Sequence, residues 1–417
     1  MSRLQFRNVR VQNYRCIAAL ELQLEDDATV LFAENGGGKT ALLTALAMGL
    51  AACQMGTRQA LRLDRHRDPR MQTLEETVHR EPVGRCEIAW TAQVGGEELV
   101  TWSSTADPRS KRVSNRRKSI LDALERVRVP GERWPLFAWY GVDRLGRQRP
   151  DRAKVVRTGD RWEGYESSLH PSLDEAPLLQ WLQDEMLGDV ARKQQGEQER
   201  FLHTTVMEAV KRAIPRVTGA WYDPVEQSPV VRFEDGHSVP WSELSDGYHV
   251  YAALVADIAR RAVVLNQLDA GEAPARVEGV ILIDEIDLHL HPRWQRVALP
   301  GLRCVFPRLQ FVVTTHSPQV LSSVENRQVR WLVNGELRDH DVHVSGRDTN
   351  AILRDHMHTD DRADSGVEAL RNLYDAIHGD DRQEAYRILE ELRDRWGDDD
   401  PELIRAEGFM DDELSGS

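Results

Sequence analysis

Apolar and polar positions alternate with a period of two through the first part of the chain. Residues 3–34 contain three short alternating runs, which predict strands. Residues 39–54 form a longer, almost wholly apolar stretch, which predicts a buried helix. Two further alternating runs, 87–94 and 98–104, are separated by a Gly-Gly turn signal and predict a hairpin.

Helical and strand patterns then alternate in the second half of the chain. Residues 178–214 predict a long helical stretch that lacks the sustained heptads of a coiled-coil arm. Strand patterns at 229–234, 279–283 and 309–316 are each followed by a helical pattern. This alternation predicts an α/β fold with a largely parallel sheet covered on both faces.

Composition narrows the class of protein. The chain has 417 residues, of which 41% are hydrophobic and 29% charged, as in soluble globular proteins. The longest apolar runs are too short to cross a bilayer, and the alternating start of the chain predicts no signal peptide. Four scattered cysteines with no CxxC pair argue against zinc and favour a reducing compartment. We therefore expect a cytoplasmic protein that does not contact membranes.

Acidic charge is concentrated at the end of the chain. Residues 354–417 hold 8 Arg and 20 Asp and Glu residues, which gives this tail most of the net charge of -14. Leucines and aromatics interleave these charges, so the tail is expected to form packed acidic helices. The remainder is nearly neutral, and the acidic pI does not exclude a nucleic-acid surface there.

A glycine-rich stretch at 33–40, AENGGGKT, provides the first chemical signal. It matches the phosphate-binding pattern G-x-x-x-x-G-K-[ST], except that Ala33 replaces the first glycine. Such glycines let backbone N–H groups turn toward an anion at a helix N-terminus. Lys39 would lie between the β- and γ-phosphates, and Thr40 would offer its hydroxyl to Mg²⁺. A simple glycine turn before a helix would not account for the Lys-Thr pair.

Three later motifs in the sequence add chemical signals to that of the glycine-rich stretch. The run GVILIDE delivers Asp284 to the end of an apolar strand, where it can hold the metal, and places Glu285 to act as general base. ELSDG places Ser245 and Gly247 at the start of a helix, and VVTTH places His316 just past a strand. A helix cap would account for ELSDG alone, and a buried polar side chain would account for His316 alone. Neither explains why the glycine-rich stretch, ELSDG, the acidic strand end and the histidine occur in this order.

This order resembles the ABC-type ATPases of the group that includes RecF, SMC heads and the overcoming-lysogenization-defect nucleases. Within that group, LSDGYH, IDEIDLHLHPRWQ, TTHSPQVL and GRDTNAILRDHM are similar to the ATPase subunit of Septu defence systems, which is also found with some retrons. The resemblance implies a P-loop ATPase head with a mixed or parallel sheet. The head would join 1–105 with 216–340, around a basic loop and helical insertion at 106–215, and 341–417 would be an acidic helical extension.

The resemblance also implies roles for matching residues. The residues expected at the triphosphate are Arg15, Asn35, Gly36, Gly37, Gly38, Lys39 and Thr40. Thr40 and Asp284 would hold Mg²⁺, Glu285 would activate water, and His316 would contact the γ-phosphate. Asp287 would lie in the loop between paired sites. Ser245 and Gly247 would face the ATP of a second subunit, which requires a homodimer or a higher symmetric oligomer.

Several positions depart from the family pattern or stay open. No glutamine loop is evident, and Tyr140 and Arg144 are the candidates to replace it. His289 and His291 invite a metal interpretation, but no metal beyond Mg²⁺ is assigned to them. Glu336, Asp339 and Asp341 lie too close together for a Toprim nuclease, so we expect no nuclease in this chain.

The segment 107–119 contains six basic residues and one acidic residue. It could contact nucleic-acid phosphates, contact a partner, or be a solvated loop. The resemblance favours an ATPase that controls a separately encoded effector, a nuclease, in anti-phage defence. The alternatives are a RecF-like DNA-repair clamp without a nuclease partner and, third, a transporter nucleotide-binding subunit. The gene beside this one would separate the first two.

Overall fold

The chain divides into two compact units, Met1–Arg347 and Asp348–Ser417. The structure is a computed structural model. It describes residues 4–34, 36–53, 71–73, 80–96, 98–107, 112–129, 131–142, 161–338, 343–357, 362, 364–379 and 381–415.

A six-stranded sheet forms the centre of the first unit, in the order β16-β15-β3-β14-β13-β9. Its strands are β3 (Ala28–Ala33), β9 (Leu136–Tyr140), β13 (Gly279–Ile283), β14 (Leu309–Thr315), β15 (Val329–Val333) and β16 (Glu336–Leu337). All neighbours pair in parallel except β15 with β16. Every residue of the four strands from β3 to β9 is buried, as expected for a parallel sheet covered on both faces. The predicted α/β class is confirmed.

The placement of β9 corrects one expected boundary. β9 lies inside the stretch 106–215 that the sequence assigns to an insertion, yet it pairs with β13 along its whole length. The insertion is therefore interrupted by a strand of the central sheet. Its five apolar residues, LFAWY, are buried because they form one edge of the hydrophobic core.

A second, antiparallel sheet has the order β2-β1-β6-β7-β8. Its strands are β1 (Leu4–Tyr14), β2 (Ile17–Gln23), β6 (Cys86–Val94), β7 (Leu99–Asp107) and β8 (Arg112–Arg116). The predicted hairpin is β6–β7, and Trp90 and Trp102 stack on the inner face of this pair. The basic segment, for which no strand was expected, supplies β8 and then α2 (Lys118–Val127), which packs on β7.

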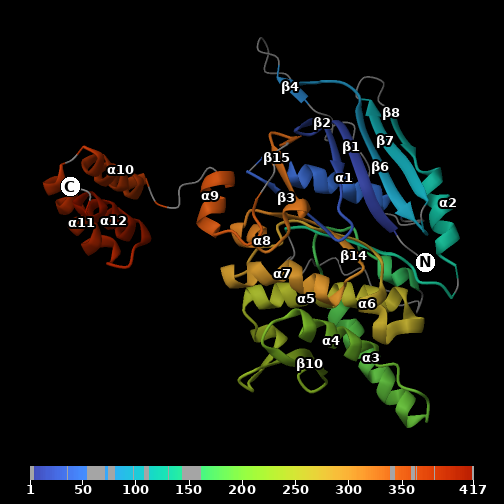
Figure 1. The fold of residues 1–417 in the computed structure, drawn as a ribbon. Helices are drawn as coiled ribbons and strands as arrows, with labels where there is room; N and C mark the ends of the chain where they lie inside the picture. Colours follow the sequence, from blue (N-terminus) through green and yellow to red (C-terminus); the bar gives the residue numbers. More distant parts are fainter. Residues whose placement is uncertain are drawn as a thin grey trace. The chain divides into compact units, whose positions relative to one another are not determined.

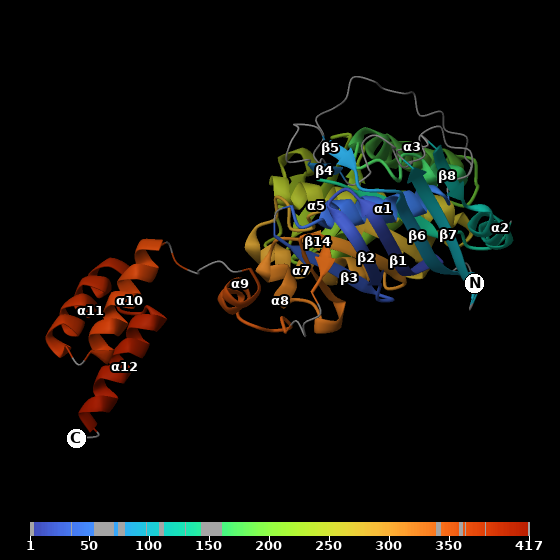
Figure 2. The ribbon, with the colours of Figure 1, turned by 90° about the horizontal axis from the view of Figure 1, so that it is seen from above.

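Helix α1 (Lys39–Ala51) lies between the two sheets and contacts strands of both. Figures 1 and 2 show it next to β1 and β6. The helix is buried all round, except at Thr40, because sheets cover it on both sides. Its apolar residues therefore form no single stripe, as expected for a helix inside a core.

Other helices cover the opposite side of the six-stranded sheet (Figure 1). They are α3 (Glu175–Gln194), α4 (Leu202–Ala213), α5 (Asp246–Leu265), α6 (Ala273–Arg276), α7 (Pro292–Val305) and α8 (Pro318–Ser322). Short 3-10 turns lie at η1 (Arg161–Tyr165), η2 (Trp241–Glu243), η3 (Gln267–Glu272) and η4 (Asn326–Gln328). The smaller sheets comprise β4 (Met71–Thr73), β5 (Arg80–Pro82), β10 (Val217–Asp223), β11 (Ser228–Phe233) and β12 (Ser238–Pro240).

The long helical stretch predicted at 178–214 is two helices, α3 and α4. The buried carboxylate of Asp189 on α3 accepts the backbone N–H groups of Arg200 and Phe201, 2.7 and 3.0 Å away. These bonds hold the turn between the helices. As predicted, no coiled-coil arm extends from this part of the chain.

A buried charge cluster joins α5 to its neighbours. Asp257 accepts hydrogen bonds from Arg260 and Arg261 on the same helix and from the Tyr140 hydroxyl at the end of β9. Arg261 also donates to the carbonyl oxygens of Gly164 and Glu166. Burial alone would raise the pKa of Asp257, but the two guanidinium groups reverse this and hold the pKa well below its ordinary value. The cluster is therefore charged and fully bonded.

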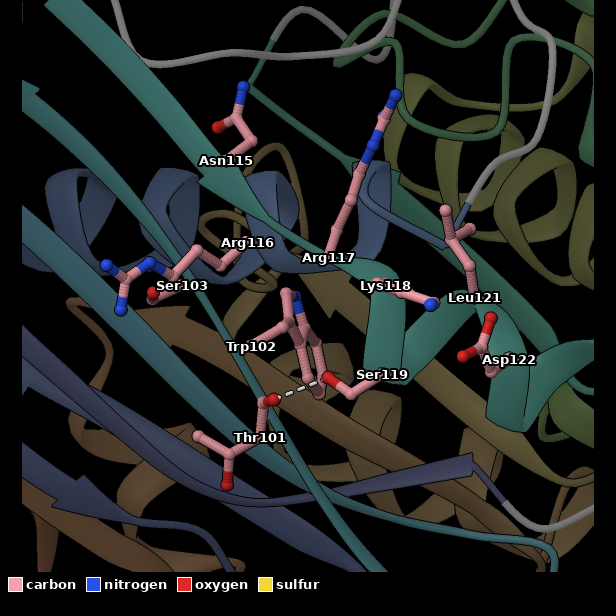
Figure 3. A pocket seen from close by; sticks show the side chains of 10 residues that line it. All are labelled: Thr101, Trp102, Ser103, Asn115, Arg116, Arg117, Lys118, Ser119, Leu121 and Asp122. Atoms are coloured by element: carbon pink, nitrogen blue, oxygen red, sulfur yellow. Dashed lines mark hydrogen bonds between the residues drawn. The ribbon is translucent and has the colours of Figure 1, made fainter.

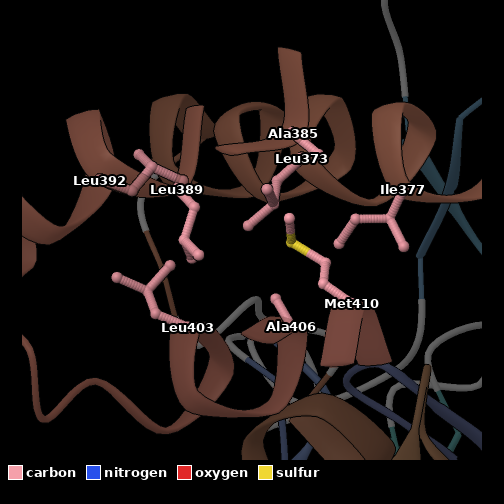
Figure 4. Packing of buried hydrophobic residues seen from close by; sticks show 8 residues of the cluster. All are labelled: Leu373, Ile377, Ala385, Leu389, Leu392, Leu403, Ala406 and Met410. Atoms are coloured by element: carbon pink, nitrogen blue, oxygen red, sulfur yellow. The ribbon is translucent and has the colours of Figure 1, made fainter. Parts of the chain in front are cut away.

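The second unit consists of α9 (Thr349–Met357), α10 (Asp364–His378), α11 (Arg382–Trp396) and α12 (Pro401–Ser415). Helices α10, α11 and α12 enclose a small apolar core, shown in Figure 4. Its buried residues are Leu373, Ile377, Ala385, Leu389, Leu392, Leu403, Ala406 and Met410. The acidic tail is thus helical, with its charges on the outside of a three-helix bundle. In neither unit does a described helix have the length and apolar character needed to span a membrane.

We expect Asp257→Asn to lower the free energy of unfolding by about 3–5 kcal/mol, because it leaves two buried guanidinium groups without their counter-charge. Chemical denaturation at neutral pH measures this. Glu208→Gln, which breaks an exposed ion pair with Lys211, is the control and should change stability by less than about 0.5 kcal/mol. Equal losses in the two variants would show that the cluster does not stabilise the fold.

Candidate nucleotide site

The glycine-rich loop connects β3 to α1, as its sequence pattern predicts. Gly38 caps α1 with φ +102°, a conformation that residues with a Cβ rarely adopt. At Gly37 an added Cβ would lie 2.7 Å from the Cβ of Ala33. The alanine at the first position of the pattern is thus accommodated because the residue opposite it is glycine. Asn35 lies outside the described residues.

Lys39 is buried at the start of α1. Its Nζ donates hydrogen bonds to the carbonyl oxygens of Ala33 and Glu34, 2.8 and 3.1 Å away. Burial lowers the pKa of Lys39, and the carboxylates of Glu285, Asp284 and Asp287 oppose that effect. Because the charge of Lys39 interacts with these carboxylates, the glycine-rich loop and the end of the acidic strand lie close together in space. They are about 240 residues apart in sequence.

Asp284 and Glu285 follow the last residue of β13. Asp284 is buried, and its Oδ1 accepts a hydrogen bond of 2.6 Å from the Thr314 hydroxyl on β14. Glu285 has φ +48°, and its N–H donates to the same Thr314 oxygen over 2.7 Å. The two acidic residues are thus fixed by the strand that lies between β13 and β3.

Asp287 and His316 lie at the same edge of the sheet. Asp287 Oδ1 accepts a 2.5 Å hydrogen bond from the Thr315 hydroxyl, and Thr315 directly precedes His316. Burial lowers the pKa of His316, and Lys39 lowers it further, while the carboxylates of Asp287 and Glu285 act in the opposite direction. The imidazole therefore lies among the same charged groups as Lys39, and its lowered pKa favours the neutral form.

Ser245 and Gly247 begin the 20-residue helix α5. Ser245 is the exposed N-cap, and its hydroxyl makes no capping hydrogen bond to the helix. An exposed N-terminus of this kind can bind an anion. A Cβ on Gly247 would lie 2.8 Å from the carbonyl oxygen of His289, so this glycine lets the helix start pack on the loop after β13.

The two histidines of the HLH segment have different structural contacts. His289 has φ +63° and presents its carbonyl group to Gly247. His291 is the N-cap of α7, where its Nδ1 accepts a hydrogen bond from the Arg293 N–H. Over the residues that the structure describes, no group of three or more His, Cys, Asp or Glu side chains could hold a metal ion.

Arg15 and Tyr140 have different surroundings. Arg15 is half-buried, and its Nη1 lies 3.5 Å from the Thr44 hydroxyl on α1, near the phosphate-binding loop. Tyr140 is buried with its hydroxyl bonded to Asp257, which leaves it unable to replace a metal-contacting glutamine. Its suggested role is therefore wrong. Arg144, the other candidate, and Asp339 and Asp341 lie outside the described residues.

Sequence reasoning missed the two threonines of VVTTH, which hold Asp284, Glu285 and Asp287. Their signal was two adjacent hydroxyl residues at the end of a largely apolar buried strand. It also missed Ser317, which caps α8 and donates to Gln295 Oε1 over 2.6 Å. Gln295 in turn donates to the Leu290 carbonyl oxygen, so α7, α8 and the acidic loop are linked.

A pocket of about 610 Å³ lies apart from these residues, on the antiparallel sheet (Figure 3). It is formed by β7, β8 and the start of α2, and its polar lining includes Ser103, Asn115 and Ser119. Arg116, Arg117 and Lys118 lie along it, all at least partly exposed and without a carboxylate partner in the part of the chain that the structure describes. Asp122 is the one acidic residue of the lining.

Comparison with known proteins agrees with this geometry. The model of the family "AAA domain, putative AbiEii toxin, Type IV TA system" matches residues 131–322, and that of a second family, "AAA domain", matches 8–198. A retron Vc95 probable ATPase of Vibrio cholerae serotype O1 biovar El Tor is 23% identical, over 79% of this chain and 73% of that protein. A retron Ec83 probable ATPase of Escherichia coli is also 23% identical, over 96% of this chain and 85% of that protein.

The Septu protein PtuA of Bacillus mycoides (strain KBAB4) is 41% identical over 23% of this chain and 13% of its own length. The chain is therefore similar in sequence to two retron ATPases and, over a shorter stretch, to a Septu protein. Among solved structures, an SMC head bound to the C-terminal winged-helix domain of ScpA aligns with a TM-score of 0.46 and 14% identity, over 80% of this chain and 96% of that one.

Proposed function

We propose that this ATPase binds ATP with Mg²⁺ at the carboxyl ends of β3, β13 and β14, and uses its hydrolysis to control a separate effector. The observation that supports this most is the convergence of Lys39, Asp284, Glu285 and His316 from three distant segments. Ligands of open parallel sheets bind at this edge. We place the protein in the cytoplasm, because that compartment supplies ATP.

The donor set suits Mg²⁺. Asp284 is a buried carboxylate and Thr40 an exposed hydroxyl on the first turn of α1, and oxygen ligands of this kind are those Mg²⁺ takes, together with phosphate oxygens. The single positive charge of Lys39 lies near three carboxylates, so the site carries an excess of negative charge. A triphosphate would be repelled by that excess unless a divalent cation accompanied it. When bound, the ion neutralises charge on the phosphates.

Each of the protein residues at the site would then have a separate role in ATP hydrolysis. Lys39 exchanges its two carbonyl partners for phosphate oxygens, and the backbone N–H groups of the loop bind the rest of the anion. Glu285 orients a water molecule and accepts its proton as the water oxygen attacks the γ-phosphorus and the bond to the β-phosphate oxygen breaks. His316, neutral before nucleotide binds, donates a hydrogen bond to the γ-phosphate.

We further propose that two copies share each nucleotide. Ser245 lies exposed at the start of α5 with a hydroxyl that caps no amide of its own helix, a geometry suited to an anion presented by another subunit. Asp287 would lie in the loop between the paired sites. The relatives named retron and Septu proteins support a role in anti-phage defence. The effector that we propose is a separately encoded nuclease.

The basic pocket supports nucleic acid as a further partner. Arg116, Arg117 and Lys118 offer positive charge beside neutral hydrogen-bonding groups, the combination that positions phosphate oxygens without reading bases. This observation also favours the second candidate function, a RecF-like nucleic-acid clamp without a nuclease partner. Identification of the co-encoded protein separates the two.

Glu285→Gln tests the hydrolytic role. We expect it to bind ATP and Mg²⁺ and to lose roughly 10²–10⁴-fold in turnover, because glutamine keeps the shape but cannot accept the proton. Its stalled ATP-bound assembly should appear as a larger species by size-exclusion chromatography. Lys39→Ala, measured alongside, should lose nucleotide affinity and show no such shift. Near-native turnover by Glu285→Gln would place the base elsewhere.

Ser245→Arg tests the shared site. This variant should bind ATP as a single subunit but fail to hydrolyse it, whereas Ser242→Arg, at an exposed serine three residues earlier, should behave as the native protein. Mixing Ser245→Arg with Lys39→Ala should restore part of the turnover. In such a mixed pair, one composite site has both an intact lysine and an intact serine. No recovery in the mixture would contradict sharing between subunits.

Arg116→Glu tests the basic pocket. It should weaken binding to duplexes of unrelated sequence alike, and the slope of log affinity against log salt should fall by more than about 0.9, the value for one lost phosphate contact on DNA. Arg276→Glu makes the same change of charge at another exposed site and is the control. Fluorescence anisotropy at several salt concentrations gives both numbers. Equal affinities and slopes for the two variants would exclude this surface.

A further inference from the structure

One buried hydroxyl group holds both acidic residues at the end of β13. Thr314 is fully buried on β14, and its Oγ1 donates to Asp284 Oδ1 over 2.6 Å while accepting the Glu285 N–H over 2.7 Å. A threonine hydroxyl has one proton to donate, and here that proton goes to the carboxylate. The donor and acceptor capacities of this one atom are thus both used on the proposed catalytic residues.

The backbone of Glu285 depends on such support. Its φ of +48° is uncommon for a residue other than glycine and persists only where the surroundings enforce it. Three hydrogen bonds do so: Glu285 N–H to Thr314 Oγ1, Ile286 N–H to the Thr314 carbonyl oxygen, and Leu288 N–H to the Glu285 carbonyl oxygen. Two of the three end on Thr314. The direction in which Glu285 leaves the strand is therefore set mainly by this threonine.

Thr315 makes the corresponding contact for the next part of the loop. Its hydroxyl donates to Asp287 Oδ1 and accepts the Ser317 N–H over 2.9 Å. Adjacent residues of a strand point to opposite faces, so the two threonines hold the loop from two sides. Together they attach residues 284–287 to β14, which ends just before His316.

We propose that Thr314 is a positioning residue for ATP hydrolysis, which sets the orientation of Asp284 and Glu285 through its hydroxyl. The inference rests on the proposed roles of those two residues. Valine would fill the same space in this strand, which already contains Val312 and Val313. The hydroxyl, rather than the volume, is what Thr314 adds to the apolar run.

The test compares Thr314→Val with Thr314→Ser. Valine keeps the shape and removes the hydroxyl, so kcat should fall roughly 10²-fold, the effect of misplacing a catalytic group by about 1 Å, with KM for ATP nearly unchanged. Serine keeps the hydroxyl and should restore most of kcat. Hydrogen–deuterium exchange of the peptide that covers 284–288 should be faster in Thr314→Val and native in Thr314→Ser. ATP binding by each variant shows that it is folded.

Hydrogen–deuterium exchange tests the Thr314 contact independently of the proposed mechanism of ATP hydrolysis. If Glu285→Gln proves as active as the native chain but Thr314→Val still accelerates exchange, the proposed role of Glu285 fails while the positioning contact stands. Native exchange in Thr314→Val, a loss confined to KM, or no recovery with serine would each overturn the inference. If valine prevents folding, Thr314→Cys, a similar volume with a weak donor, takes its place with the same expectations.

Discussion

The pairing of β14 with β3 on one side and β13 on the other is the contact on which the site depends. Parallel strands present their carboxyl ends at one edge of a sheet, so this order places the phosphate-binding loop, the acidic pair and His316 along a single line. The three segments are far apart in the chain, so interactions between sequence neighbours cannot bring them together. The long-range hydrogen bonds between strands are what bring these three scattered motifs into one charged cluster.

The burial of α1 adds rigidity to this arrangement. A helix with one apolar stripe can shift on its neighbours, whereas α1 is enclosed between two sheets along nearly its whole length. Trp90 fixes it further, since its indole N–H donates to the Ala45 carbonyl oxygen over 2.9 Å. The helix N-terminus therefore presents its partial positive charge toward the position proposed for the triphosphate without movement of the helix, and only the Lys39 side chain has to exchange partners.

Much of this could be predicted from local pattern. Mostly apolar runs located β13 and β14, because fully buried parallel strands need no polar face, whereas β3 was predicted from an alternating run although all its residues are buried. AENGGGKT located the turn into α1. What failed were features decided by tertiary contact. LFAWY was assigned to an insertion because nothing local shows that it pairs with residues 279–283, and Tyr140 was given a metal role because Asp257 lies 117 residues away. Thr314 and Thr315 were passed over because hydroxyl residues suit any strand.

Contact between Gly247 and His289 connects the acidic loop to the start of α5. The approach is so close that any displacement of the loop after β13 must move the helix start or break the contact. The other end of the loop is attached to His316 through Thr315 and Asp287. Should subunits share nucleotides as proposed, a change at one γ-phosphate would reach the Ser245 offered to the other nucleotide through three adjoining contacts. The buried Asp257 cluster keeps the middle of α5 attached to the end of β9, so the start of the helix is the part that is held by the acidic loop.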